Sequence, residues 1–573
     1  MRPWPVWRLL THQHTMNNTK WWQSAVFYQI YPRSFADGNG DGVGDFLGMT
    51  QKLDHLRDLG VDAIWLSPHF PSPFVDCGYD VSDFQGVGPE YGTLDDFKTF
   101  LHEAHARNIR VLLDLVLNHS SDQHAWFTES RSSLNNPKRD WYMWRDGVDG
   151  GPPNNWISIF GGSAWTLDPA TGQYYYHAFL KDQPDLNWRN PELKQAMWNA
   201  VRFWLDMGVD GFRLDAIGTC FEDPDLRPHA VQLDPGEGNA PFTNHERFQQ
   251  VLQFQIQQPG VHELMKELRA VIDEYPGDRV LIGEDEDVRY HGGGDDELHL
   301  VFNFGLMRAQ RLSPAHIRSN QTERLAALGS NWPCNTLGHH DGRRLWSRYG
   351  DGVHDAELAR LHLALLATMR GTPFIYNGDE IGQTDLVLDR LEQFRDTAAT
   401  AAYRRMTTVG GVSPEEALAK IQTESRDRCR APVQWRNAPN GGFCPEGVSP
   451  WLPVNADYAT GVNVEDQAAD PASLLNFCRR VLALRRANPA LSVGDYTPLD
   501  ESHQEVLSFT RHDPASGQTC LVALNFSDQA QVAATGLNVS ARVLFSTATG
   551  RPEVAQPDRL SLAPHEILIT QLG

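Results

Sequence analysis

The sequence predicts an α/β protein: a closed (β/α)8 TIM barrel with a subdomain inserted after the third strand and an antiparallel β-sandwich at the C-terminus. Three observations predict this architecture. Short apolar runs alternate with helical patterns along most of the chain, one interval between them is far longer than a single crossover needs, and period-two alternation replaces helical patterning near the end. With 573 residues and 41% hydrophobic content, the chain can bury a large core and should divide into two or three domains.

Eight apolar runs, several of which end in acidic or His residues, are the predicted barrel strands: AVFYQIYP, VDAIWLSP, IRVLLDLVLNH, GVDGFRLDAI, DRVLIGEDE, LHLVFNF, CNTLGHHD and GTPFIYNGDE. Helical patterns such as LDDFKTFLHEAHARN lie between them. In NPELKQAMWNAVRFWLDMG, Asn190 is the predicted N-cap, Pro191 the first helical residue and Gly208 the exit. Eight strands that alternate with helices favour a closed barrel, which we assign to residues 21–119 and 189–489.

The interval between the third and fourth predicted strands is rich in Trp, Tyr, Asn, Gly and Pro, as in GPPNNWISIFGGSAWTLDP. We assign residues 120–188 to an inserted subdomain B that overhangs the barrel mouth. After about residue 490, the runs VLSFTRH, CLVALNFS, ARVLFSTATG and LSLAPHEILITQL alternate with a period near two. Residues 490–573 are therefore the predicted β-sandwich.

The net charge, the N-terminal stretch and the cysteines limit which partners the protein can bind and in which compartment it is expected. A formal charge of −23 without a basic run argues against nucleic acid and anionic membranes and favours a neutral or cationic small substrate. We expect residues 1–20 to be a disordered tail, because Pro and Arg interrupt its apolar residues and no signal-peptide core forms; Met16 is an alternative start. No run is apolar enough to span a bilayer. Seven Cys without CxxC spacing are typical of reduced thiols in a cytoplasm. We expect a monomer or a small homo-oligomer.

The stretch DGNGDGVGD, residues 37–45, has the spacing of the first part of a helix–loop–helix calcium site, with Gly42 at the bend. Four residues would supply side-chain oxygens: Asp37, Asn39, Asp41 and Asp45. The match stops at the twelfth position, where Gly48 stands in place of a bidentate Glu, so a static site is predicted rather than a switch. A polar turn without a metal is the alternative. We favour the cation, because three carboxylates that converge without a counter-ion would repel.

Active sites of such barrels lie where the strands end, so polar residues that directly follow apolar runs are the candidates. Three carboxylates qualify: Asp215 follows GFRL, Glu284 follows VLIG and Asp341 follows NTLGHH. A helix N-cap could explain one acid at a strand end, but it does not account for the Arg and His residues that accompany these acids. We therefore predict that the three acids converge on one mouth with Arg213, His119 and His340.

Two carboxyls that face one bond are the machinery of glycoside hydrolysis. A separation of about 5 to 5.5 Å lets one attack the anomeric carbon while the other protonates the departing oxygen. We expect Asp215 to stay ionised beside Arg213, and Glu284 to have a raised pKa because it faces other acids. The rival acids of the same stretch do not directly end the apolar run: Asp285, Glu286 and Asp287.

Four ordered segments resemble the signature regions of the α-amylase superfamily, glycoside hydrolase family 13: DLVLNH (114–119), GFRLDAI (211–217), LIGE (281–284) and GHHD (338–341). Three more are similar to its oligo-1,6-glucosidase and α-glucosidase subgroup, which acts on short α-glucosides from the non-reducing end: QPDLN (183–187), GYDVSDF (78–84) and ESRDRCRAPVQW (424–435). The similarity runs from about Trp21 to the C-terminus.

The resemblance implies a role for each matched residue. Asp215 matches the nucleophile, Glu284 the general acid/base and Asp341 the stabiliser of the transition state. The residues that would hold the first sugar are a stacking platform, Tyr79, and its polar companions: Asp80, His119, Arg213, His340 and Arg344. Arg426 would lie by the second sugar, with a surface salt bridge as the alternative. The resemblance also implies a structural calcium or magnesium ion on Asp37, Asn39, Asp41, the Val43 carbonyl and Asp45.

The leading hypothesis is a retaining, exo-acting α-glucosidase that removes terminal α-linked glucose from short oligosaccharides. Ala216 favours α-1,4 linkage, because in the resembling subgroup a Val at this position tends to accompany α-1,6 activity. The alternatives of the same fold are an oligo-1,6-glucosidase and a glucosyl-transferring or isomerising enzyme of the trehalose synthase or sucrose isomerase type. His339 and Asn377 depart from the usual family residues and leave acceptor specificity open. A non-catalytic barrel that serves as a partner subunit is disfavoured, because the three carboxylates are present.

Overall fold

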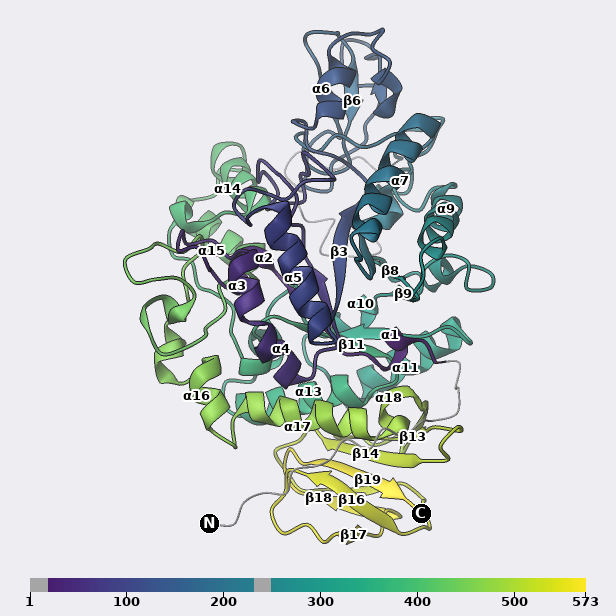
Figure 1. The fold of residues 1–573 in the computed structure, drawn as a ribbon, viewed down its shortest axis with the longest axis vertical. Helices are drawn as coiled ribbons and strands as arrows, with labels where there is room; N and C mark the ends of the chain where they lie inside the picture. Colours follow the sequence, from purple (N-terminus) through teal and green to yellow (C-terminus); the bar gives the residue numbers. More distant parts are fainter. Residues whose placement is uncertain (1–18, 231–248) are drawn as a thin grey trace.

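The computed structural model describes residues 19–230 and 249–573 (Figure 1). The predicted N-terminal tail lies outside the described residues except for its last two positions, and the alternative start at Met16 lies outside them too. Within the described ranges, no helix combines the length and the apolar character that crossing a membrane requires.

An eight-stranded parallel sheet forms the centre of the molecule, and its strands fall within the eight predicted runs: β1 Phe27–Ile30, β2 Ala63–Leu66, β3 Arg110–Val116, β7 Gly211–Asp215, β8 Val280–Gly283, β9 Leu300–Val301, β10 Cys334–Thr336 and β11 Thr372–Tyr376. The strand order is β10-β11-β1-β2-β3-β7-β8-β9. Side chains join the two edges, because the Cys334 thiol donates to the Val301 carbonyl at 3.3 Å and the Asn303 amide donates to the Asn335 side-chain oxygen at 3.0 Å. The predicted barrel is confirmed, and it is nearly closed.

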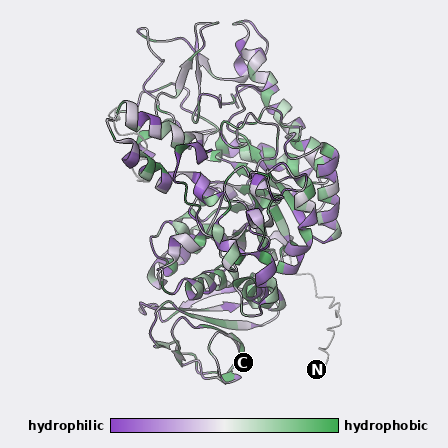
Figure 2. Cartoon of the chain, turned by 90° about the vertical axis from the view of Figure 1, so that its left-hand side faces the viewer, coloured by the Kyte–Doolittle hydropathy of each residue, from purple (hydrophilic) through white to green (hydrophobic). Residues whose placement is uncertain are grey.

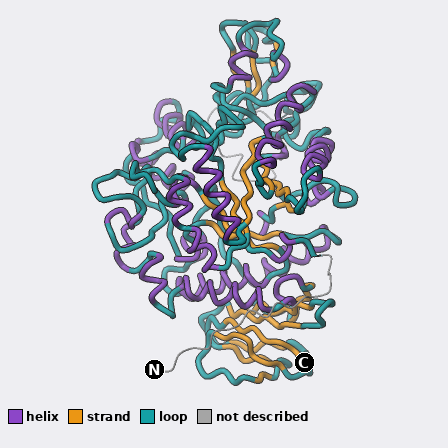
Figure 3. Tube along the Cα trace, viewed as in Figure 1, coloured by secondary structure: helices purple, strands orange, loops and turns teal. Residues whose placement is uncertain are grey.

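Helices surround the sheet, as Figure 3 shows. Those that precede or connect the barrel strands are α1 Trp21–Ser24, α2 Pro32–Phe35, α3 Phe46–Gln51, α4 Leu53–Leu59, α5 Leu94–Ala106, α7 Pro191–Asp206, α9 Val261–Asp273, α10 Phe304–Met307, α11 Pro314–Leu328, α12 Leu345–Tyr349 and α13 Asp355–Thr368. Those that follow β11 are α14 Thr397–Thr408, α15 Pro414–Glu424, α16 Val464–Ala469, α17 Leu474–Ala487 and α18 Pro489–Val493.

The predicted caps of α7 are present. The Asn190 side-chain oxygen accepts the N–H groups of Glu192 and Leu193 at 2.9 and 3.1 Å, and Pro191 opens the helix with its fixed φ. Gly208 follows the helix with φ of 102°, a conformation that glycine adopts without a steric cost. The chain is thereby turned directly into β7, the strand that carries Asp215.

The chain between β3 and α7 forms a small subdomain that projects from the barrel beyond the carboxyl end of β3, at the top of Figure 1. It holds α6 Ala125–Arg131 and a three-stranded antiparallel sheet of β4 Trp144–Arg145, β5 Trp165–Leu167 and β6 Tyr174–Tyr176. Aromatic residues make its core, since Trp156, Trp165 and Tyr176 are all less than 5% exposed. The insertion after the third strand is confirmed.

The C-terminal part is a pair of antiparallel sheets at the opposite end of the molecule (Figure 1). One sheet has the order β12-β13-β14-β19-β16-β17 and the other pairs β15 with β18. Their bounds are β12 Asp495–Leu499, β13 Val506–His512, β14 Thr519–Asn525, β15 Gln531–Ala534, β16 Ala541–Ser546, β17 Val554–Ala555, β18 Arg559–Leu562 and β19 Ile567–Leu572. Leu521 and Leu568 of the larger sheet pack with Leu560 and Leu562 of the smaller one. The β-sandwich is confirmed.

Alternate residues of the barrel strands belong to different cores. Phe27, Trp65, Leu112 and Ile282 pack together in one cluster, whereas their sequence neighbours join the larger cluster that includes the helices. Hydrophobic and hydrophilic residues alternate along the surrounding helices (Figure 2). Because side chains of a strand alternate between its faces, the residues two further along from Leu112 and Ile282 point into the barrel as well. These residues are Asp114 and Glu284.

Candidate active site

Arg213 binds three carboxylates that lie within, at the end of and directly after three neighbouring strands. Its Nη1 atom lies 2.7 Å from Asp114 of β3 and 2.7 Å from Asp215 of β7, and its Nη2 atom lies 2.8 Å from Glu284, directly after β8. The Arg213 side chain is 2% exposed, whereas those of Asp215 and Glu284 are 11% and 23% exposed. The guanidinium therefore lies beneath two carboxyls that a substrate can still reach.

Glu284 is anchored from the end of β7. Its backbone N–H donates to the Leu214 carbonyl at 2.9 Å, and its Oε2 atom accepts the backbone N–H of Ala216 at 2.9 Å. Together with the ion pair to Arg213, these contacts hold the carboxyl beside Asp215. The predicted pairing of Asp215 with Glu284 is present in the structure.

Burial raises the pKa of both carboxyls. The pKa of Glu284 rises to about 8, because burial and the charges of Asp215 and Asp341 outweigh Arg213. The pKa of Asp215 rises to about 7, because burial and Asp114 outweigh the same guanidinium. Glu284 is the weaker acid, as expected. Arg213 lowers the pKa of Asp215, in the direction expected, but it does not outweigh burial and the charge of Asp114, since three carboxyls share one cation.

Asp341 has the opposite electrostatics. Burial alone would raise its pKa, but the Nε2–H group of His340, 3.0 Å away, and the charges of Arg430 and Arg426 hold the pKa of this carboxyl well below its usual range. The Arg430 guanidinium donates to it at 2.6 Å, and Arg426 lies 3.8 Å away. Asp341 is therefore the carboxylate of this site that keeps its negative charge through the acid range.

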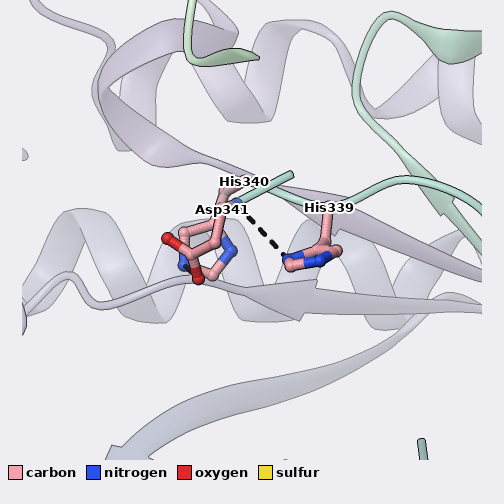
Figure 4. Close-up of side chains that lie close together, drawn as sticks. All are labelled: His339, His340 and Asp341. Atoms are coloured by element: carbon pink, nitrogen blue, oxygen red, sulfur yellow. Dashed lines mark hydrogen bonds and ion pairs between the residues drawn. The ribbon is translucent and has the colours of Figure 1, made fainter. Parts of the chain in front are cut away.

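His340 is held as a neutral ring beside Asp341 (Figure 4). Its Nδ1 atom contacts the Gln29 amide nitrogen, a donor, at 2.7 Å, so the proton is assigned to Nε2. That atom lies 2.7 Å from the Tyr79 hydroxyl and 3.0 Å from Asp341, and Tyr79 in turn donates to Asp114 at 3.1 Å. The Tyr79 ring stacks on His340 with centroids 5.4 Å apart. These contacts link Tyr79, His340 and Asp341 to the carboxyls on Arg213.

Figure 4 also shows His339, whose Nδ1 atom accepts the backbone N–H of Asp341 at 3.3 Å. Among the described residues, the group His339, His340 and Asp341 brings three potential metal ligands within 4.8 Å of one another. Both ring nitrogens of His340 are already hydrogen-bonded to Gln29 and Tyr79. The geometry therefore matches a polar site that orients Asp341 and does not match a metal centre.

His119 and Arg426 line the same region from two further elements. The His119 Nε2 atom lies 2.9 Å from the Gln183 amide, which also donates to Asp76 at 3.2 Å. Arg426 lies 2.6 Å from Asp76 and 2.9 Å from Asp396, the N-cap of α14. It is 17% exposed, so a surface salt bridge does not describe it. Arg426 joins the loop after β2 to the segment after α15, next to Asp341.

The structure does not bring two predicted residues into this cluster. Asp80 is fully buried, and its carboxylate accepts hydrogen bonds from the Ser72 hydroxyl and from the N–H groups of Val75 and Asp76. It therefore stabilises the loop after β2 instead. Arg344 is fully buried too; it donates to the carbonyls of Asn377 and Ala431 and lies over Tyr376.

Three residues of the cluster were missed by the sequence reasoning: Asp76, Asp114 and Arg430. Asp114 lies in the middle of an apolar run and Asp76 precedes the GYD segment, so neither directly ends a strand. Arg430 stands four residues after Arg426 in ESRDRCRAPVQW. The inward parity of Asp114 with Leu112 and its place at the start of DLVLNH were signals that could have been used, as was the place of Arg430 in ESRDRCRAPVQW.

The rival acids after Glu284 have other partners. Asp285 accepts the N–H groups of the two residues that follow it, at 2.7 and 2.9 Å. Glu286 pairs with Arg308 and Asp287 with Arg289. Their side chains are thereby held away from Arg213, which leaves Glu284 as the partner of Asp215.

The loop 37–45 is tied together by its own backbone. Asp37 accepts the N–H groups of Gly40 and Gly42, and Asp45 accepts those of Gly38, Asn39 and Gly48 while it caps α3. Oxygen donors of this kind suit a hard cation, and a carboxylate with two or three N–H partners keeps free lone pairs. The donor set therefore fits calcium in its chemistry.

Two carboxyls that a substrate can reach share one buried guanidinium at the strand ends of a parallel barrel. This arrangement is typical of enzymes that cleave glycosidic bonds. Residues 29–494 match the family described as alpha amylase, catalytic domain. The chain therefore belongs to the α-amylase family of glycoside hydrolases.

Relatives and solved structures agree with this membership. The chain is 39% identical over 531 residues to an oligo-1,6-glucosidase of Parageobacillus thermoglucosidasius, with 89% of this chain and 91% of the relative covered. It is 42% identical over 523 residues to a probable alpha-glucosidase of Rhizobium meliloti, with 89% and 90% covered. Its fold is similar to the trehalulose synthase MutB of Pseudomonas mesoacidophila MX-45 at 37% identity and a TM-score of 0.87, with 97% of this chain and all of that chain covered.

Proposed function

We propose that the protein is a retaining, exo-acting α-glucosidase that hydrolyses short oligosaccharides, with a preference for α-1,4 linkage. The observation that carries this proposal is the bridge of Arg213 between Asp215 and Glu284, which holds two carboxyls side by side on neighbouring strands. A water molecule for an inverting reaction needs a wider gap between the carboxyls, of about 6.5 to 9.5 Å. Adjacent strands joined by one guanidinium favour the retaining geometry.

In this mechanism Asp215 attacks the anomeric carbon and forms a glucosyl ester, while Glu284 gives its proton to the departing glycosidic oxygen. Glu284, now ionised, takes a proton from the water that hydrolyses the ester. The raised pKa of Glu284, about 8, keeps it protonated at neutral pH for the first step. Asp341 would accept hydrogen bonds from sugar hydroxyls, because it stays charged.

The ion pair of Arg426 with Asp76 supports exo action. It closes one side of the region beside Asp341 by joining two loops, and Phe160 of the inserted subdomain lies against the Arg426 guanidinium, which is 5.4 Å from the centroid of the Phe160 ring. A terminal sugar can be enclosed there, whereas a continuing chain would have to break the pair. Tyr79, with its ring on His340, is the proposed platform for that sugar.

A second candidate is an isomerising or glucosyl-transferring enzyme, favoured by the similarity to structures of sucrose-converting enzymes. One is described as an isomaltulose synthase mutant from Erwinia rhapontici NX5 in complex with its natural substrate sucrose, at 35% identity and a TM-score of 0.87. The two candidates differ in whether water or a sugar accepts the glucosyl group.

We also propose a structural calcium ion, with magnesium as an alternative, on the loop 37–45, through Asp37, Asn39, Asp41, the Val43 carbonyl and Asp45. A cytoplasmic location is proposed as well, supported by seven free and buried thiols. We expect a monomer or a small homo-oligomer.

Product analysis tests the proposed activity. With maltose, isomaltose, sucrose and trehalose as substrates, glucose released first as the α-anomer supports retention, and β-glucose would contradict it. Asp215→Asn and Glu284→Gln should each lower turnover by at least about 10²-fold with folding unchanged, because each removes a chemical role and little volume. Isomaltulose or trehalulose as the main product from sucrose would favour the second candidate. Near-normal turnover by Asp215→Asn would overturn both.

A further inference from the structure

Ala216, the residue after the proposed nucleophile, has a left-handed backbone, with φ of 44° and ψ of 43°. An L-residue other than glycine rarely adopts this region, because its Cβ approaches the neighbouring carbonyl oxygen. Such conformations persist where the surrounding structure enforces them. Ala216 lies between β7 and the turn that follows, so the contacts of that turn are what hold it in the left-handed conformation.

The turn after Ala216 is held at several points. The Ala216 carbonyl accepts both the N–H and the hydroxyl of Thr219, at 3.0 and 2.7 Å, which closes the 3-10 turn Ile217–Thr219. The Gly218 carbonyl accepts the N–H of Gln257 at 2.6 Å. A Cβ atom on Gly218 would lie 2.9 Å from the carboxylate of Asp285, so the turn is also packed tightly against the segment after β8. The left-handed residue is thus fixed from both sides.

The conformation redirects one backbone hydrogen bond. In a parallel ladder in which the N–H of Glu284 donates to Leu214, a continuing strand would turn the N–H of Ala216 toward the backbone carbonyl of Glu284. Instead, this N–H donates at 2.9 Å to Oε2 of the Glu284 side chain. The other oxygen, Oε1, is held by Arg213. Both oxygens of the proposed acid are therefore held by groups at the end of β7.

We propose that Ala216 is a positioning residue, whose left-handed backbone directs its N–H to the Glu284 carboxyl and so sets the orientation and the proton affinity of that group. The proposal rests on the role of Glu284 as general acid/base. A backbone donor favours the ionised carboxylate. It therefore opposes the effect of burial, and it stabilises the ionised form that must accept a proton in the second half of the reaction.

Replacing one backbone atom tests the proposal. Lactic acid introduced at position 216 by nonsense suppression converts the amide to an ester and removes the N–H while it keeps the methyl side chain. The basic limb of the kcat/KM pH profile, which reports the loss of the Glu284 proton, should move to higher pH by about half a unit or more, because the carboxylate has lost a donor. We expect kcat to fall by about tenfold.

Two matched comparisons accompany this measurement. The corresponding ester at Ile217, whose N–H does not contact Glu284, should leave the basic limb in place. Thr219→Val removes the hydroxyl that binds the Ala216 carbonyl and should shift the limb in the same direction as the ester at 216, whereas Thr219→Ser should not.

An ester at 216 with an unchanged basic limb would overturn the proposal, and so would an equal shift from the ester at 217. These outcomes differ from failure of the proposed function. Full turnover by Glu284→Gln would refute the role of Glu284 itself, whereas an inactive Glu284→Gln with an unshifted ester at 216 refutes only the role of Ala216.

Discussion

Two regions of this molecule gather several carboxylates, and they stabilise the negative charge in different ways. One is the strand-end cluster of Arg213, Asp215, Glu284 and Asp341, and the other is the loop 37–45. The cluster is partly buried and uses side-chain cations: Arg213 beneath one pair of carboxyls and Arg430 beside Asp341. The loop lies nearer the surface and binds its carboxylates with backbone N–H groups. The kind of partner, a side-chain cation or a backbone N–H group, therefore distinguishes the carboxyls proposed for catalysis from those of the loop.

Backbone N–H groups favour the ionised form of a carboxylate without adding a net positive charge, so the loop can still bind a cation, and burial is what raises the pKa of its Asp45. Carboxyls that share one guanidinium compete for its charge, and this competition keeps their pKa values close to neutral pH. Burial and this competition raise the pKa of Asp215 and Glu284, whereas His340, Arg430 and Arg426 beside Asp341 lower the pKa of that carboxyl. The acidic region that spans the widest range of proton affinities is therefore the one that we assign to catalysis.

Removing Arg213 should break this comparison most strongly. We predict that Arg213→Met lowers the free energy of unfolding at neutral pH by about 3–5 kcal/mol, because three carboxyls, of which Asp114 and Asp215 are buried, lose their shared cation. Urea unfolding measures the effect. Arg279→Met is the matched control: its partner Asp210 keeps His105 and Arg110, so the loss should be smaller. Equal losses in the two variants would show that Arg213 has no special electrostatic role.

The loop provides the next test. If calcium binds there, exhaustive chelation should lower Tm and the free energy of unfolding, by about 3 kcal/mol when the ion had been present at a hundred times its Kd. Activity at mild temperature should survive, because the loop donates no group to the strand-end cluster. Asp37→Asn should abolish the effect of added calcium. An unchanged Tm after chelation would favour a plain polar turn, and immediate loss of activity in the folded protein would place the ion in the chemistry.

The sequence predicted the barrel, the insertion and the sandwich, because alternating apolar runs report directly on strands that are buried. Asp215 and Glu284 were predictable for the same reason, since each ends such a run. The burial of Asp80 and Arg344 among other partners was not predicted, because a motif names a residue but not whether its side chain turns into a loop or toward the mouth. Arg430 was missed, because its approach to Asp341 depends on how a long irregular segment returns to the barrel. No periodicity encodes that path.

The proton of Glu284 gives a third prediction, about stability and pH. Its pKa is raised to about 8 from 4.5, so the folded state holds the proton more tightly than the unfolded one. The stabilisation of the folded state by the Glu284 proton is complete below pH 4.5 and is lost as pH rises through about 8. A Gln at this position does not titrate, so the variant does not lose stability in this way. The stability of Glu284→Gln relative to wild type should therefore increase by on the order of 2 kcal/mol between pH 5 and pH 8.5.

Urea unfolding at both pH values measures this difference. The control is Ala419→Gln, at an exposed position of α15, which changes no titratable group, so that its difference from wild type should not change with pH. A constant difference for Glu284→Gln would mean that Glu284 is ionised throughout, and the contrast between the cluster and the loop would lose its electrostatic basis.

The smallest effect concerns linkage, and it depends on the side chain of Ala216 rather than on its backbone. A side chain next to the nucleophile borders the leaving sugar, and a branched Val narrows the space that an α-1,4-linked sugar must occupy. One or two methyl groups in a pocket change preference by only about 1–3 kcal/mol. We predict a higher kcat/KM for maltose than for isomaltose, and a shift of the ratio toward isomaltose in Ala216→Val.

The ratio is the informative quantity, because Val is also strained in the left-handed conformation of residue 216. Strain that displaces the N–H from Glu284 lowers kcat/KM for both substrates alike and cancels in the ratio, whereas steric exclusion does not. Ala216→Gly separates the two further, since it relieves the strain and widens the space. Its ratio should move toward maltose or stay in place. A wild-type preference for isomaltose, or an Ala216→Val ratio equal to that of wild type, would show that linkage is set by residues farther from Asp215.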